Sequence, residues 1–103
     1  MESVYEMFED LRQRPGMYLG KKSITLLDVY FGGYIHDEFK SNPNYHTSFF
    51  GFTDFVRKYH NGSLSKGWPT LILDAVNGNE EKAVDLFYEL LDEFLIGQNQ
   101  IKD

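Results

Sequence analysis

The sequence contains no cysteine, and its basic side chains are fewer than its acidic ones. Without cysteine the chain cannot form disulfides, thiolate metal sites or a thiol nucleophile. Ten lysines and arginines against sixteen aspartates and glutamates give a formal net charge of −6 at pH 7. This is the wrong sign for neutralising the phosphates of DNA or RNA. We therefore expect no direct nucleic-acid partner, and an acidic excess favours a basic protein as partner.

No apolar run reaches the roughly 18 residues that a membrane-spanning helix needs. The first residues are acidic and lack the basic start and the long apolar segment of a secretory signal peptide. We therefore predict a cytoplasmic protein with no membrane partner. Because the 103 residues show no linker, repeat or low-complexity segment, we expect residues 1–103 to form a single domain.

The segment from Arg14 to Gly20 carries the clearest local signals. Pro15 prevents a helix from continuing and Gly16 can adopt positive φ, so this pair predicts a type II turn. Gly20 permits a second reversal after a short extended apolar segment, and Ser23 is a favourable N-cap for the next helix. We therefore interpret Pro15, Gly16 and Gly20 as structural turn residues.

Hydrophobic periodicity predicts about five helices. The expected segments are residues 3–13 with Ser3 as N-cap, 23 to about 39, 53–59, 68–76 with Pro69 at its start, and a last helix capped by Asn79. The second helix is apolar around most of its circumference, which predicts a central position. Gly32 and Gly33 in its middle indicate either a bend or a close crossing by another element.

The aromatic segment before residue 53 leaves one alternative open. A strand from Ser48 to Phe52 competes with a helix there, because short apolar runs do not separate the two by periodicity. The predicted fold class is therefore mainly α, a single-domain bundle of about five helices around the central second helix. A short β-hairpin near residues 45–52 is the alternative for this segment.

One side of the last helix carries an acidic stripe. Like charges four residues apart destabilise a helix by a few tenths of a kcal/mol each, so helix stability does not account for the stripe. Its members are Asp85, Glu89, Asp92 and Glu93. We predict that these four residues bind a basic partner.

No pattern in the sequence indicates catalysis. The segment Gly16 to Ser23 ends in two lysines and a serine at a helix start, but a P-loop needs four residues between its glycines and a strand in front. His36, His46 and His60 have no metal-ligand spacing, and no Gly-x-Ser-x-Gly occurs. We expect no catalytic residue, no cofactor and no metal. Two functions other than binding a basic protein are alternatives: a small nucleotide- or anion-binding domain that uses Gly16 to Ser23, and a structural adaptor.

The seven residues Arg-Pro-Gly-Met-Tyr-Leu-Gly, from Arg14 to Gly20, resemble a segment of the ATPase domain of the DNA gyrase B subunit. In that family the next helix carries the Glu and Asn that serve water and magnesium, and an Asp-x-Gly-x-Gly motif follows. Here the helix after Ser23 has no asparagine and the second motif is missing. The resemblance implies a shared turn and not ATP hydrolysis.

A wider resemblance covers most of the chain. The Pro-Gly-Met-Tyr-Leu-Gly turn, the apolar helix, Phe-x-x-Phe-Val from Phe52, Gly67-Trp68 and Phe-Tyr-Glu-Leu-Leu-Asp-Glu-Phe from Phe87 resemble small bacterial immunity proteins. Such proteins are encoded beside polymorphic or contact-dependent growth inhibition toxins. The resemblance implies a non-enzymatic inhibitor of a toxin domain. A basic nuclease is the class of toxin that an acidic inhibitor would fit.

Overall fold

The structure is a computed structural model that describes residues 2–14, 20–60 and 64–102. These residues form five α-helices and one short 3₁₀-helix, with no strand in the described ranges. The elements are α1 (Ser3–Gln13), α3 (Ile24–Ser41), η1 (Ser48–Gly51), α4 (Phe52–Tyr59), α5 (Trp68–Ala75) and α6 (Glu80–Lys102). The predicted mainly α fold with about five helices is therefore confirmed.

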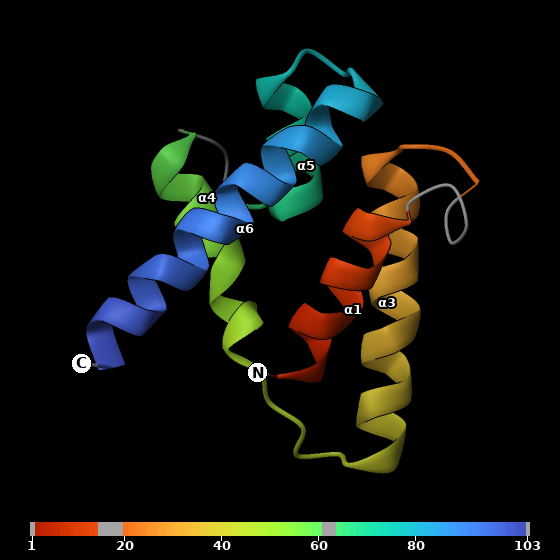
Figure 1. The fold of residues 1–103 in the computed structure, drawn as a ribbon, viewed down its shortest axis with the longest axis vertical. Coiled ribbons are helices and arrows are strands. Elements are labelled where there is room, and N and C mark those ends of the chain that lie inside the picture. The colour runs from red at the N-terminus through yellow and green to blue at the C-terminus, as the bar shows by residue number, and fades with distance from the viewer. Residues whose placement is uncertain (1, 15–19, 61–63, 103) are drawn as a thin grey trace.

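The helices form two groups in space. Figure 1 shows α1 and α3 as an antiparallel pair on one side and α4, α5 and α6 together on the other. Side chains of α6 contact both helices of the first group, through Tyr88 to Phe8 of α1 and through Glu80 to Thr25 of α3, and α5 also packs against α3. Each helix in the described ranges is too short or too polar to cross a bilayer.

The β-hairpin alternative for residues 45–52 is wrong. The Thr47 side chain is buried and its Oγ1 accepts a hydrogen bond from the Phe49 backbone N at 3.2 Å, which caps η1. The chain then passes from η1 directly into α4. This turn places Phe49 and Phe52 on the same side, facing the core, where their ring centroids lie 5.0 Å apart.

Five aromatic rings from five different elements meet in the core. The Phe87 ring lies 4.9 Å from Trp68 and 5.1 Å from Phe8 between ring centroids. Phe49 lies 4.9 Å from Phe8, and Phe52 lies 5.5 Å from Phe87. All five residues are buried. The centre of the fold is therefore an aromatic cluster around α6, built from α1, η1, α4, α5 and α6, and the half-buried Phe31 of α3 contacts three of its rings.

The prediction that the second helix is central is wrong. Of its apolar residues, α3 fully buries Ile24 and Leu27, whereas Val29 is 67% exposed. A Cβ atom added at Gly32 or Gly33 would meet no heavy atom within 4 Å, so no described element crosses there closely. The helix also continues through both glycines without interruption. Although α3 has apolar residues all round, only one of its sides is buried, because the rest of the described chain covers that side alone.

Helix boundaries confirm most of the predicted caps. Gly20 has φ +73°, as the expected reversal requires, while Pro15 and Gly16 lie outside the described residues. Ser23 Oγ accepts a hydrogen bond from the Leu26 backbone N at 3.2 Å. Asn79 Oδ1 accepts one from the Lys82 backbone N at 3.0 Å. These two residues are N-caps, as predicted.

The predicted N-cap at Ser3 is wrong. Ser3 is the first residue of α1, and Glu2 occupies the N-cap position without a side-chain cap. The Ser3 hydroxyl instead hydrogen-bonds to the Tyr34 hydroxyl of α3. Ser3 therefore connects α1 to α3, a tertiary contact that the sequence around Ser3 does not indicate.

Candidate functional site

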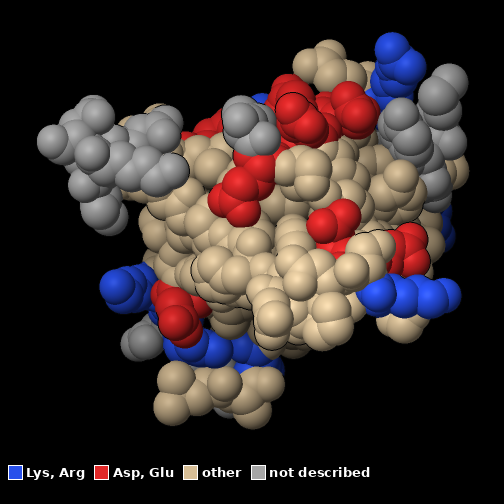
Figure 2. Space-filling model, turned by 90° about the horizontal axis from the view of Figure 1, so that it is seen from below, with Lys and Arg blue, Asp and Glu red and all other residues tan. Residues whose placement is uncertain are grey.

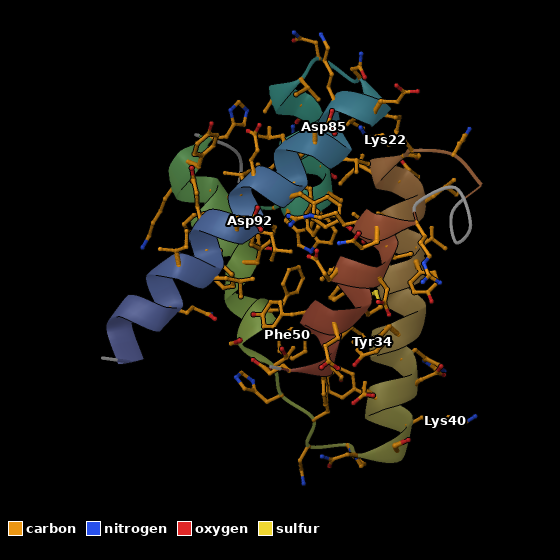
Figure 3. The ribbon with its side chains drawn as sticks, viewed as in Figure 1. Lys22, Tyr34, Lys40, Phe50, Asp85 and Asp92 are labelled. Carbon is orange, nitrogen blue, oxygen red and sulfur yellow. The ribbon has the colours of Figure 1, made fainter. Side chains whose placement is uncertain are left out.

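The acidic stripe of α6 divides into two kinds of carboxylate. Asp85 Oδ1 lies 2.5 Å from Lys22 Nζ, and Asp92 Oδ1 lies 2.8 Å from Arg12 Nη2. Figure 3 shows Asp85 beside Lys22, and Asp92 further along the same helix. Glu89 and Glu93 are exposed and form no ion pair with any described residue. The structure thus gives two members of the stripe a partner within the chain and leaves two facing solvent.

The paired carboxylates still face outward. The Asp85 and Asp92 side chains are 61% and 55% exposed, so both ion pairs lie at the surface. Exposed pairs of this kind contribute little to stability, about 0 to 1 kcal/mol each. The two cations nevertheless reduce the local negative charge that an approaching protein meets.

Arg12 of α1 makes several contacts with α6. Its guanidinium lies 4.4 Å from the centre of the Tyr88 ring and also donates to the Tyr88 carbonyl oxygen at 3.2 Å. The Tyr88 hydroxyl donates to the Phe8 carbonyl oxygen at 2.7 Å, and burial raises the pKa of this phenol. Glu9 belongs to the same helix as Arg12, and its Oε2 lies 3.4 Å from Arg12 Nη1. Carboxylates of two helices are thereby brought to one cation.

Acidic side chains also gather on a larger scale. Figure 2 shows Asp and Glu along the upper edge of that view, with few Lys or Arg side chains between them. The contact of Arg12 with both Glu9 and Asp92 shows that acids from α1 and α6 adjoin. The stripe predicted on a single helix is therefore part of an acidic surface that two helices share.

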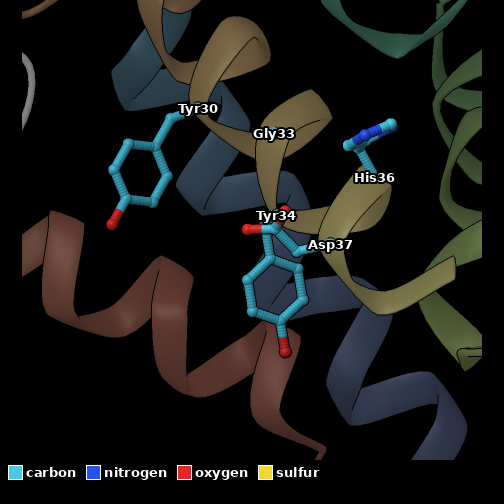
Figure 4. A pocket seen from close by; sticks show the side chains of 5 residues that line it. All are labelled: Tyr30, Gly33, Tyr34, His36 and Asp37. Atoms are coloured by element: carbon cyan, nitrogen blue, oxygen red, sulfur yellow. The ribbon is translucent and has the colours of Figure 1, made fainter. Parts of the chain in front are cut away.

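A second surface lies on α3 and was not predicted. Tyr30, Gly33, Tyr34, His36 and Asp37 line an open groove of about 450 Å³. In Figure 4 both tyrosines lie on one side of the helix and His36 points to the other. Asp37 takes part in no ion pair or hydrogen bond among the residues described. The visible signal in the sequence was the glycine pair between two tyrosines, which we interpreted as a bend or a close crossing by another element.

Further aromatic side chains are exposed at the end of α3. The rings of Phe39 and Phe50 are nearly parallel with centroids 6.2 Å apart, and Tyr45 packs edge-on against both. Phe50 belongs to η1 and is labelled in the lower half of Figure 3. Burial is the main cause that raises the pKa of the Tyr45 hydroxyl. This aromatic cluster is a third feature of the surface, and it is apolar.

No group of three His, Asp or Glu side chains within the described ranges is arranged to hold a metal ion. Comparison of the chain with protein-family models, with curated proteins and with solved structures finds no match.

Proposed function

We propose that this chain is a non-enzymatic immunity protein that neutralises a bacterial toxin domain by direct binding through the acidic surface of α6. A basic nuclease is the class of toxin that fits. The observation that supports the proposal is the exposure of Glu89 and Glu93 without an ion pair among the described residues. Acidic surfaces of inhibitors imitate the phosphates that a nuclease cleft binds, and they accelerate association.

The two paired carboxylates have a different part in the proposed interface. The ion pairs with Lys22 and Arg12 restrict the positions of Asp85 and Asp92, which lowers the entropy cost of ordering them at an interface. Glu89 and Glu93 supply the charge that no described cation offsets. We therefore expect Glu89 and Glu93 to control the rate of association, and Asp85 and Asp92 to contribute shape and hydrogen-bond acceptors.

The first test is to find the partner. If the reading frame beside this gene encodes the C-terminal domain of a large secreted protein, that domain is purified with this chain and binding kinetics are measured at several salt concentrations. Glu89→Lys with Glu93→Lys should slow association about tenfold and flatten its salt dependence. The melting temperature should stay nearly the same, because neither side chain has a partner within the described structure.

The matched control reverses two charges on α1. Glu6→Lys with Asp10→Lys changes the net charge equally, and both residues are exposed without a described ion pair. Equal slowing by both double variants would mean that only net charge matters. No slowing by either would remove α6 from the interface.

The anion-binding alternative has less support. Ser23 Oγ and the Thr25 backbone N, at the start of α3, donate to the Glu80 carboxylate at 2.8 and 2.9 Å. A carboxylate therefore already occupies the position where a phosphate would meet the helix N-terminus. Lys22, in the same segment, is paired with Asp85. Calorimetric titration with ATP tests this alternative directly, and micromolar binding would restore it.

A further inference from the structure

A groove lies between α4 and α6, two helices that pack against each other (Figure 1). Asp54, Phe55 and Lys58 line it from α4, and Phe94 and Gly97 line it from α6. Its volume is about 220 Å³. Sites for drug-sized ligands usually measure about 300 to 1,000 Å³, so this groove suits a smaller molecule.

Two aromatic rings form the apolar part of this groove. The ring centroids of Phe55 and Phe94 lie 5.5 Å apart, with 59° between the ring planes. A Cβ atom at Gly51, which also lines the groove, would lie 3.8 Å from Phe94 Cζ, and one at Gly97 would meet no heavy atom within 4 Å. Neither glycine has a positive φ, so the backbone does not require glycine at either position. The two missing side chains therefore leave room for a ligand beside the rings.

The polar part of the groove holds one charge of each sign. Lys58 is exposed and has no ion pair or hydrogen bond among the described residues. Asp54 Oδ1 pairs with Arg57 Nη1 at 2.6 Å, but the Asp54 side chain is 78% exposed and its Oδ2 has no partner within the described chain. Residues four positions apart lie on the same face of a helix. The groove thus presents an ammonium and a carboxylate oxygen on one side of α4.

We infer that this groove binds a free aromatic amino acid. The Lys58 ammonium donates to the carboxylate of the ligand, Asp54 Oδ2 accepts from its ammonium, and its ring packs against Phe55 and Phe94. A peptide terminus has only one of these two charged groups on its last residue, so the lining favours the free amino acid. The net charge of −6 on the whole chain repels a simple anion, whereas a zwitterion carries no net charge.

The test is a titration of the ¹⁵N-labelled protein with L-phenylalanine. The amides of Gly51 and Gly97 report from the groove, and those of Gly33 and Gly78 report from positions that do not line it. We expect saturable chemical-shift changes at Gly51 and Gly97 and none at the other two glycines. Changes of equal size at all four, or no saturable change at Gly51 and Gly97, would overturn the inference.

Three analogues separate the contributions of the ligand's groups. N-acetylphenylalanine lacks the ammonium, phenylalaninamide lacks the carboxylate, and cyclohexylalanine lacks the aromatic ring. Each should bind about threefold more weakly than phenylalanine, because each loses one of the three contacts. Equal binding of N-acetylphenylalanine would mean that the groove holds the C-terminus of a peptide. Equal binding of all four compounds would mean a general apolar hollow, and either result would overturn the assignment to a free amino acid.

Two variants and their matched controls locate the ligand. Lys58→Met removes the ammonium and Gly97→Leu fills the groove, so each should weaken the binding of phenylalanine about fivefold or more. Lys82→Met changes the net charge equally, and Gly32→Leu adds the same side chain to another helix; neither position lines the groove. Both controls should leave the affinity unchanged. Equal weakening by a variant and its control, or none by Lys58→Met and Gly97→Leu, would overturn the inference.

This inference is independent of the proposed immunity function. The residues that line the groove include none of the four carboxylates of the acidic stripe. The titration with amino acids requires no toxin, so a negative titration leaves the toxin proposal as it stands. Failure to find a toxin partner would equally leave the titration result unchanged.

Discussion

The carboxylate of Glu80 holds both the backbone and the side chain of Thr25. Oε1 accepts a hydrogen bond from the Thr25 backbone N at 2.9 Å, and Oε2 accepts one from Thr25 Oγ1 at 2.7 Å. Because Glu80 opens α6 and Thr25 lies in the first turn of α3, one side chain satisfies the N-terminus of another helix. The same carboxylate lies in the first turn of its own helix, where negative charge is also favourable.

This contact predicts a pH-dependent loss of stability in Glu80→Gln. The hydrogen bond from the Thr25 backbone, and then those from the Thr25 and Ser23 side chains, lower the pKa of Glu80 below its ordinary value of 4.5. A lowered folded-state pKa contributes stability above about pH 4.5, and this contribution is lost as the pH falls through the folded-state value. We expect Glu80→Gln to lower the free energy of unfolding by about 1 kcal/mol at pH 7, because the site is partly open to water.

Urea unfolding over a series of pH values measures the effect. The difference between wild type and Glu80→Gln should shrink toward zero in strong acid, where both carry a neutral side chain. Glu81→Gln is the matched control, since Glu81 is exposed in the same helical turn and has no described hydrogen-bond or ion-pair partner. Equal losses from the two variants would mean that the helix dipole alone explains them.

The Arg12 and Asp92 pair gives a second prediction. Asp92→Asn should lower the free energy of unfolding by about 0.5 kcal/mol, whereas Glu93→Gln should have almost no effect. A double-mutant cycle with Arg12→Gln should give a coupling energy of the same size that decreases at high salt. Zero coupling at low salt would show that the pair is not formed in solution. Asp92 would then be a carboxylate without an ion-pair partner, like Glu93 among the described residues.

The position of the core gives a third prediction. Phe87→Ala removes a fully buried ring at the centre of the aromatic cluster and should destabilise the protein by about 3 to 5 kcal/mol. Val29→Ala, on the exposed side of α3, should change the free energy of unfolding by less than about 0.5 kcal/mol. Comparable losses in chemical unfolding would restore α3 as the central helix.

The contrast between α6 and α3 shows how far the sequence could predict the fold. In α6, Ala83, Phe87, Leu90 and Phe94 recur at helical spacing with acids on the other side, so the sequence itself indicates which side of this helix is buried. In α3 apolar residues occur all round, so periodicity could not indicate which side packs inward. η1 begins at the buried Thr47 cap, and composition alone did not distinguish this turn from a strand.

The candidate sites were predicted less completely than the fold. The four acids of α6 could be found by spacing, but Arg12 and Asp92 are separated by 80 positions, and no local rule pairs them. Two of the four carboxylates therefore have internal partners that the sequence did not reveal. The groove on α3 was missed because we interpreted the glycine pair as a bend or a close crossing by another element. Only the packing shows that no described element crosses α3 closely there.

Two glycines give a fourth prediction, with opposite signs. Gly20 has φ +73°, which an L-residue with a Cβ adopts at a cost, so Gly20→Ala should destabilise by about 1 kcal/mol. Gly32 lies inside α3 with no heavy atom within 4 Å of an added Cβ, so Gly32→Ala should stabilise by about 0.5 to 1 kcal/mol. Thermal and urea unfolding of both variants in one buffer measure the two changes.

A stabilising Gly20→Ala would remove the assignment of Gly20 as a turn residue. A destabilising Gly32→Ala would mean that this side of α3 is packed in solution, against another part of the chain or a second molecule.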